Sequence, residues 1–312
     1  MSFTSNPTSL LDNKKHLIVI AGPTAIGKSQ LAIDVAHEFS CEILSADSRQ
    51  FYREMIIGTA KPTQDEMQNI PHHFINNLSI NEHCSVGDFE KEALKVIEDL
   101  HQKNDVAIMV GGSGLHINGV IYGFDELPPS DEKTRAFLEE QYQLYGIQWL
   151  QKKMHELDEV TFKKIDRDNH HRMMRAIEVC MVTGAPYSQL LQKKAKPRPF
   201  ETIFIVLNSD REKLYAKINS RVDEMMKNGL LEEVKGLINH QQNNALNTVG
   251  YKEIFEHLNG NCTLEFAVDK IKQNSRNYAK RQITWFKKNE EAHWFEPTQK
   301  EEILKFIKES LA

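Results

Sequence analysis

The chain has 312 residues, of which 40% are hydrophobic and 27% are charged, and its net charge at pH 7 is −5. This length predicts about two domains, and the composition is typical of an ordinary globular protein. The net charge argues against indiscriminate nucleic-acid binding, although a local basic face remains compatible with it.

No apolar run approaches the roughly 20 residues that a membrane-spanning helix needs, so we expect no membrane contact. Residues 1–7 lack the basic and apolar regions of a secretory signal. The cysteines are scattered, without a C-x-x-C pair, which indicates a reduced, cytoplasmic protein without disulfides or structural zinc.

An apolar run at residues 16–21 predicts a buried strand, and a complete G-x-x-x-x-G-K-[ST] phosphate-binding loop follows it at residues 22–29. A helix-compatible stretch from Ser29 to Phe39 supplies the strand–loop–helix context that this motif requires. The glycines allow backbone N–H groups to point at phosphate oxygens, and the start of the helix adds partial positive charge. We favour this interpretation over an ordinary turn without a ligand. The residues expected to bind a diphosphate or triphosphate are Gly22, Thr24, Ala25, Ile26, Gly27, Lys28 and Ser29, and the Ser29 hydroxyl is a natural ligand for Mg²⁺.

The first third of the chain alternates expected strands with expected helices. Further strands are expected at residues 41–45, 105–110 and, with a weaker pattern, 72–75, and a helix at residues 87–102. This alternation predicts right-handed crossovers and a parallel sheet, whose ligands gather at the carboxyl ends of the strands. Polar loops are therefore expected at one edge of the sheet, at residues 22–29, 47–50 and 111–114.

The pattern changes to helices alone from about residue 125 to residue 199, between segments that contain prolines. The expected helices cover residues 131–144, 147–157 and 169–183. A strand at residues 202–207 and a long basic helix near residues 264–287 then return to the core. We predict an α/β fold with a P-loop NTPase-like parallel sheet core, in two parts (residues 1–124 and 200–312), and a helical insertion domain (residues 125–199).

Positive charge is concentrated in two segments. Residues 270–288 contain seven Lys or Arg and no Asp or Glu, and a second basic cluster covers residues 193–198. Most charged runs are simply solvated faces, but the absence of acidic residues weakens that interpretation for residues 270–288.

A series of blocks, in the same order, resembles the tRNA dimethylallyltransferase (tRNA isopentenyltransferase) family over nearly the whole chain. The blocks lie at residues 22–29, 45–52, 58–62, 70–75, 111–115, 172–179, 221–225, 248–253 and 276–286. The resemblance implies transfer of a dimethylallyl group from dimethylallyl diphosphate to the exocyclic amine of the adenine 3′ of the anticodon in tRNA. It also implies the anticodon stem-loop as the partner, and because nothing suggests an obligate dimer, we expect a monomer.

This chemistry needs a base for a weakly nucleophilic amine and a site that stabilises charge on the leaving diphosphate. Asp47, after the second strand, is the candidate base, with a turn or helix-cap aspartate as the alternative. The Ser113 hydroxyl is placed to reach the diphosphate unless it belongs to an ordinary turn, and the family usually has Thr there. Only the resemblance implies that Arg221 reaches the diphosphate, because an arginine on a helix is usually solvated or ion-paired. Lys28 and Mg²⁺ would also stabilise the leaving group.

Recognition of tRNA requires contacts to unstacked bases and to the backbone, because the target adenine must leave its stack. The expected tRNA-binding residues are Asp47, Ser48, Arg49, Gln50, His171, Arg172, Met173, Met174, Arg175, Arg276, Lys280 and Arg281. The family often has Gln where this chain has His171. Lys61 could bind either the phosphate or the tRNA backbone, and the sequence does not decide between them. We interpret His72 and His73 as structural residues or as residues near the RNA.

Two other functions compete with this prediction. A nucleotide or small-molecule kinase would explain the phosphate loop and the sheet, but not the basic helix or residues 47–50. A GTP- or ATP-driven binding module would need a guanine-reading Asn-Lys-x-Asp sequence or an apolar strand that ends in Asp for Mg²⁺. The chain has no such sequence, and the apolar run at residues 106–110 ends in Gly111 and Gly112.

Overall fold

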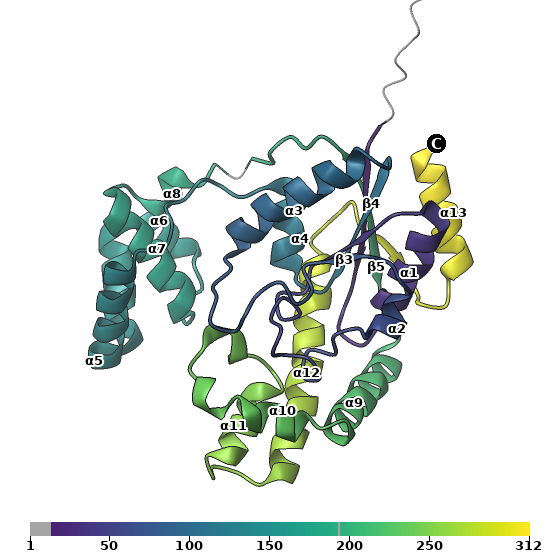
Figure 1. Cartoon of the computed structure of the whole chain (residues 1–312). Coiled ribbons are helices and arrows are strands. Elements are labelled where there is room, and N and C mark those ends of the chain that lie inside the picture. Colours follow the sequence, from purple (N-terminus) through teal and green to yellow (C-terminus); the bar gives the residue numbers. More distant parts are fainter. Residues whose placement is uncertain (1–13, 193) are drawn as a thin grey trace, which may run out of the picture. The chain divides into compact units, whose positions relative to one another are not determined.

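The computed structural model describes residues 14–192 and 194–312. The expected start of the core at residues 1–13 and Lys193 of the second basic cluster lie outside the described residues. The chain divides into two compact units (Figure 1): unit 1 comprises Met1–Ile121 and Arg198–Ala312, and unit 2 comprises Tyr122–Pro197.

Unit 1 is built on a six-stranded sheet of order β3-β2-β4-β1-β5-β6, in which every pair of neighbours is parallel. The strands are β1 (His16–Ala21), β2 (Ile43–Ser45), β3 (His72–His73), β4 (Val106–Gly111), β5 (Glu201–Leu207) and β6 (His293–Phe295). His16 of β1 pairs with Val106 on one side and Glu201 on the other. β1 and β4 are buried along their whole length, which explains their continuous apolar sequences. The predicted parallel α/β fold is confirmed.

Helices cover both faces of this sheet, with α1 and α13 on one side and α3 and α4 on the other (Figure 1). The helices of unit 1 are α1 (Lys28–Phe39), α2 (Gln64–Met67), α3 (Val86–His101), α4 (Gly114–Tyr122), α9 (Arg211–Lys227), α10 (Leu230–Gly236), α11 (Tyr251–Leu258), α12 (Leu264–Phe286) and α13 (Lys300–Leu311), with short 3₁₀ helices η1 (Ile238–His240) and η2 (Asn244–Leu246). The main hydrophobic core joins alternate residues of β1, such as Ile18 and Ile20, to α1, α9 and α13. None of these helices, nor any other in the described part of the chain, has the length and apolar character needed to cross a membrane.

Unit 2 is helical and contains α5 (Glu132–Leu157), α6 (Glu159–Lys164), α7 (His170–Thr183) and α8 (Tyr187–Leu190). Helix α5 is interrupted at Gly146, whose φ of 70° and ψ of −166° are not helical. This interruption separates the two helices expected at residues 131–144 and 147–157. The core of the unit includes Leu138, Leu150 and Met154 of α5.

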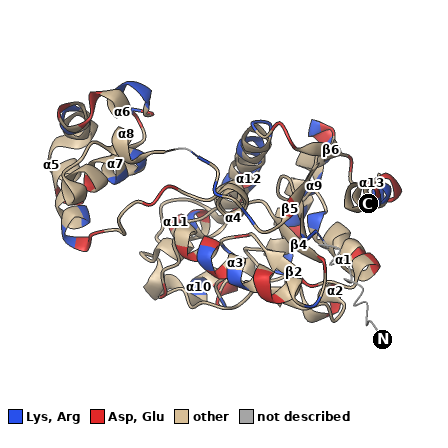
Figure 2. Ribbon diagram, turned by 90° about the horizontal axis from the view of Figure 1, so that it is seen from above, with Lys and Arg blue, Asp and Glu red and all other residues tan. Residues whose placement is uncertain are grey.

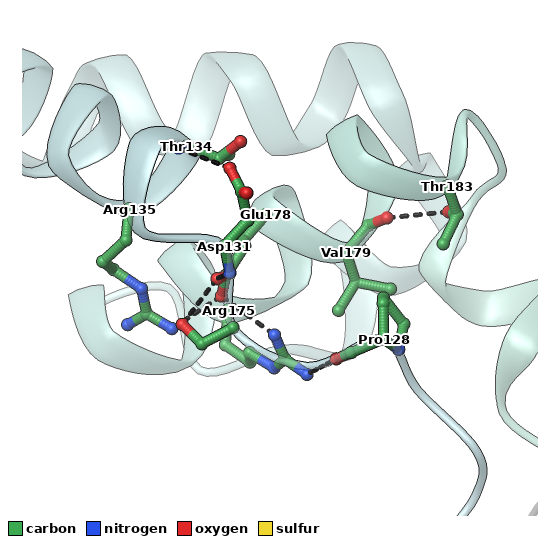
Figure 3. A network of polar contacts seen from close by, with 9 residues as sticks. Pro128, Asp131, Thr134, Arg135, Arg175, Glu178, Val179 and Thr183 are labelled. Carbon is green, nitrogen blue, oxygen red and sulfur yellow. Dashed lines mark hydrogen bonds and ion pairs between the residues drawn. The ribbon is translucent and has the colours of Figure 1, made fainter. Parts of the chain in front are cut away.

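A buried carboxylate organises unit 2 (Figure 3). Glu178 has no exposed surface and accepts hydrogen bonds from the Ser130 hydroxyl and the Asp131 N–H, both at 2.8 Å. Arg135 and Arg175 approach its other oxygen at 2.6 and 3.0 Å. These contacts join α7 to the start of α5 and leave the buried charge fully compensated.

Candidate active site

The phosphate loop connects β1 to α1 at the carboxyl edge of the sheet. Gly22 has a φ of 147° and Gly27 a φ of 106°, which favour glycine at both positions. A side chain at Gly22 would also place its Cβ 2.6 Å from the Leu207 carbonyl oxygen of β5. Lys28 donates a hydrogen bond to the Pro23 carbonyl at 2.8 Å, so its ammonium lies over the loop.

Asp47, Lys28 and Arg221 lie close enough to influence one another electrostatically. Burial lowers the pKa of Lys28 to about 8, although the Asp47 carboxylate opposes this shift and Arg221 adds to it. Burial also lowers the pKa of Arg221, again opposed by Asp47. Arg221 of α9 donates to the Thr24 hydroxyl at 3.4 Å. The tertiary structure therefore brings a carboxylate and two cations to the phosphate loop.

The loops that carry Asp47 and Ser113 are joined by hydrogen bonds. The Ser113 N–H donates to the Ala46 carbonyl, and the Ser48 N–H donates to the Ser113 hydroxyl, both at 3.2 Å. Asp47 accepts a hydrogen bond from the Arg49 N–H at 3.0 Å, so one of its oxygens stabilises a turn. No described residue donates a hydrogen bond to its other oxygen, which can therefore accept from a substrate.

Gln282 of α12 is a site residue that the sequence analysis did not identify. Its side-chain oxygen accepts a hydrogen bond from the Thr24 N–H, and its nitrogen donates to the Gly112 carbonyl, both at 2.9 Å. A Cβ at Gly112 would lie 2.2 Å from the Gln282 amide nitrogen, so a side chain there would displace this amide. The available signal was the i, i+4, i+7 spacing of Tyr278, Gln282 and Trp285, which places all three on one side of the helix.

Tyr278 and Trp285 contact the loop after β4 from the same side of α12. A Cβ at Gly114 would lie 2.2 Å from Trp285 Cδ1. Desolvation raises the pKa of the Tyr278 phenol to about 12, and Asp47 adds to this rise, whereas a hydrogen bond with Ser113 opposes it. Tyr278 therefore lies near both proposed catalytic loops.

The comparisons with known proteins agree with this geometry. The sequence profile of the family described as IPP transferase matches residues 50–289. The chain belongs to this family. It is 48% identical to the tRNA dimethylallyltransferase of Flavobacterium johnsoniae over 304 residues, which cover 95% of this chain and 98% of the relative. It is 50% identical to the tRNA dimethylallyltransferase of Christiangramia forsetii over 281 residues, covering 90% of this chain and 93% of the relative.

Solved structures of IPP transferases are similar as well. The full-length tRNA isopentenylpyrophosphate transferase of Bacillus halodurans has a TM-score of 0.71 and 37% identity, and the match covers 96% of this chain and 97% of that one. A eukaryotic dimethylallyltransferase acting on tRNA has a TM-score of 0.73 and 29% identity, over 87% of this chain and 70% of that one. The predicted family is thus confirmed, the protein is a prenyltransferase, and the kinase alternative is not favoured.

In this IPP transferase the side chains of Arg49 and Gln50 hold neighbouring loops. Arg49 donates to the Asn244 and Ala245 carbonyls at 3.1 and 3.0 Å. Gln50 donates to the Thr59 carbonyl at 3.3 Å. Their polar groups are therefore engaged within the protein, and contacts to tRNA from them remain a prediction.

Helix α7 presents only part of the segment predicted to bind tRNA. Met173 and Met174 are fully buried in the core of unit 2, and Arg175 pairs with Glu178 and donates to the Pro128 carbonyl at 2.5 Å. Side chains without exposed surface cannot touch a partner, so Met173 and Met174 have a packing role in this structure. His171 and Arg172 are exposed.

Helix α12 carries the other predicted RNA contacts. Lys280 and Arg281 are exposed, and Arg281 lies over the Tyr278 ring, 5.8 Å from its centroid. Arg276 is half-buried and donates to the Asn219 side chain at 2.6 Å.

Lys61, His72 and His73, whose roles the sequence did not decide, contact neighbouring residues of the protein. The buried Lys61 ammonium donates to the Tyr52 carbonyl and the Asn76 side chain, both at 2.6 Å, which indicates a structural role. The His73 ring contacts Glu42 at 2.7 Å, and the His72 ring contacts the Ile70 carbonyl at 2.8 Å.

Proposed function

We propose that this protein transfers a dimethylallyl group from dimethylallyl diphosphate to the exocyclic amine of the adenine 3′ of the anticodon in tRNA, with release of diphosphate. The observation that carries the proposal is the placement of Asp47 beside a complete phosphate loop and within electrostatic reach of Lys28 and Arg221. Relatives of similar length are named tRNA dimethylallyltransferases.

The phosphate loop would hold the group that leaves. As the bond between the allylic carbon and the diphosphate oxygen breaks, negative charge grows on that oxygen. Lys28 and Arg221 supply positive charge there, and Ser113 supplies a hydroxyl. The Thr24 N–H is occupied by Gln282, so the remaining N–H groups of the loop are the ones available to phosphate oxygens.

Asp47 would act as the general base. The adenine amine attacks the allylic carbon, a nitrogen–carbon bond forms, and the displaced amine proton passes to the Asp47 carboxylate. A positioned base of this kind typically contributes about 10²–10⁴-fold to a rate. The turn hydrogen bond from the Arg49 N–H holds one oxygen of Asp47 in place, and the second oxygen would accept the proton.

The site also suits Mg²⁺. The Ser29 hydroxyl, at the start of α1 directly after Lys28, is the residue that would hold it, with substrate oxygens as further ligands. When bound, the ion would supply further positive charge to the leaving diphosphate.

The tRNA would bind through the basic face of α12, with Arg276, Lys280 and Arg281, through residues 47–50 and through His171 and Arg172 in unit 2. Residues 125–199 would serve as the tRNA-binding insertion domain and the anticodon stem-loop as the recognised element. We propose a monomer that acts in the cytoplasm.

A pair of incubations tests the proposed function. The protein is mixed with labelled dimethylallyl diphosphate, Mg²⁺ and unmodified tRNA, and with the same tRNA in which the adenine 3′ of the anticodon is replaced by guanine. We expect label in the first RNA and none in the second. Absence of label from both, with phosphate transfer from ATP to a small molecule, would favour the kinase instead.

A further inference from the structure

Three cations surround one aromatic ring in unit 1. Arg211 of α9 lies 5.1 Å from the centroid of the Tyr215 ring, and Arg276 and Lys280 of α12 each lie 5.9 Å from it. Helices α9 and α12 pack against each other, which brings these charges together from distant parts of the sequence (Figure 1).

The cluster has no acidic partner within the described residues, because no carboxylate there forms an ion pair with Arg211, Arg276 or Lys280. The hydrogen bond from Arg276 goes to Asn219, which is neutral. Three positive charges gathered around one ring repel one another unless an anion offsets them. The arrangement therefore favours binding of an anion.

The pKa of Tyr215 agrees with a positive potential around its ring. Burial alone would raise the pKa of its phenol, but Arg211 and Lys280 beside it lower that pKa below its ordinary value. The Tyr215 hydroxyl oxygen is shielded from solvent and lies beside Arg211 and Lys280. A phosphate bound by the three cations would therefore lie near this ring.

We propose that Arg211, Arg276, Lys280 and Tyr215 form a binding site for a backbone phosphate of tRNA, which extends the RNA surface from α12 onto α9. This proposal rests on the proposed function. Arg221, which contacts the phosphate loop, lies ten positions after Arg211 on the same helix, or about 15 Å along its axis at 1.5 Å per residue. One diphosphate is too small to bridge that separation, whereas a polyanion carries further phosphates.

The salt dependence of tRNA binding tests the site. In Arg211→Gln, we expect the slope of log K against log salt to shrink by about 0.7 to 0.9, as for the loss of one phosphate contact. Affinity at low salt should fall roughly three- to tenfold. Lys213→Gln, which removes an exposed charge from the same helix without a contact to the ring, is the matched control and should bind as the wild type does. Equal slopes for the two variants would overturn the proposal.

A second measurement identifies the source of the phosphate. In protein with isotope-labelled tyrosine, the NMR signal of Tyr215, assigned with Tyr215→Phe, should shift when tRNA is added and stay in place with inorganic pyrophosphate at equal ionic strength. A shift with pyrophosphate, or a raised KM for dimethylallyl diphosphate in Arg211→Gln with unchanged tRNA affinity, would contradict RNA as the ligand. If the wild type transfers label to tRNA but Arg211→Gln keeps the wild-type dependence of tRNA affinity on salt, the proposed phosphate site is wrong and the proposed function stands. If the wild type transfers no label to tRNA, the proposed function itself is wrong.

Discussion

Gln282, within helix α12, accepts a hydrogen bond at 2.9 Å from the backbone N–H of Thr24, which lies 258 positions earlier in the chain. The same side chain donates to the Gly112 carbonyl at 2.9 Å. One buried amide thus joins the proposed diphosphate loop, the loop that carries Ser113 and the helix proposed to bind RNA. The position of the phosphate loop is therefore coupled to α12.

Replacing Gln282 with Met should disturb this coupling. The Thr24 N–H and the Gly112 carbonyl would lose their partners, and each buried group left unpaired costs about 1–3 kcal/mol. We expect a lower Tm and a KM for dimethylallyl diphosphate that rises more than the Kd for tRNA. Gln273→Met, at an exposed position of the same helix, is the control, and kinetic constants equal to those of the control would contradict the coupling.

The Asp47→Asn variant should lose transfer activity. The amide retains an oxygen that can accept from the Arg49 N–H, so the turn is preserved while the base is removed. We expect the single-turnover rate to fall by about 10²–10⁴-fold, with tRNA affinity within a few-fold of wild type. The exposed Asp99→Asn change in α3 should have no effect. An unchanged single-turnover rate in Asp47→Asn would remove Asp47 as the base.

Reversing two charges on α12, Lys280→Glu and Arg281→Glu together, should weaken tRNA binding. Fewer released counterions should also flatten the dependence of affinity on salt. The same reversal at Lys91 and Lys95 of α3, where acidic and basic residues are interleaved (Figure 2), controls for net charge. Equal affinity of both double variants at low salt would argue against α12 as an RNA surface.

The Glu178→Gln variant should destabilise unit 2 and change its response to acid. Burial by itself would raise the pKa of Glu178, but hydrogen bonds from Ser130, Arg175 and Arg135 hold it below its ordinary value. The carboxylate therefore stabilises the folded unit fully above its ordinary pKa, near 4.3, and this stabilisation is lost as the pH falls through the lowered pKa.

Hydrogen exchange in α5 and α7 measures this effect. At pH 7, the change should cost about 3–5 kcal/mol, because two arginines lose their buried partner. The acid-dependent loss of protection should be weaker in Glu178→Gln than in the wild type. Glu156→Gln, which removes only an exposed charge from α5, should behave as the wild type does. Identical pH profiles for all three proteins would show that Glu178 does not contribute in this way.

Much of the fold could be predicted from local patterns. Apolar runs predicted β1, β4 and β5, and the helices expected at residues 131–144 and 147–157 correspond to the two parts of α5 on either side of Gly146. The short edge strand β6 could not be predicted, because His293–Phe295 has neither length nor alternation, and its strand form depends on pairing with β5. The weak strand pattern at residues 72–75 corresponds to only two paired residues, His72 and His73. Their strand form likewise depends on pairing with a neighbouring strand, β2.

The sequence by itself determined the phosphate loop, because its backbone angles depend on the residue types at Gly22 and Gly27 and on the strand and helix beside them. Only the tertiary structure decided which polar side chains face the site and which are used within the protein. Lys61 and Arg175 carry the same charge as Lys280, yet the Tyr52 carbonyl and the Glu178 carboxylate engage them within the protein. Contacts of this kind join residues that are distant in sequence or depend on burial, and no local pattern specifies them.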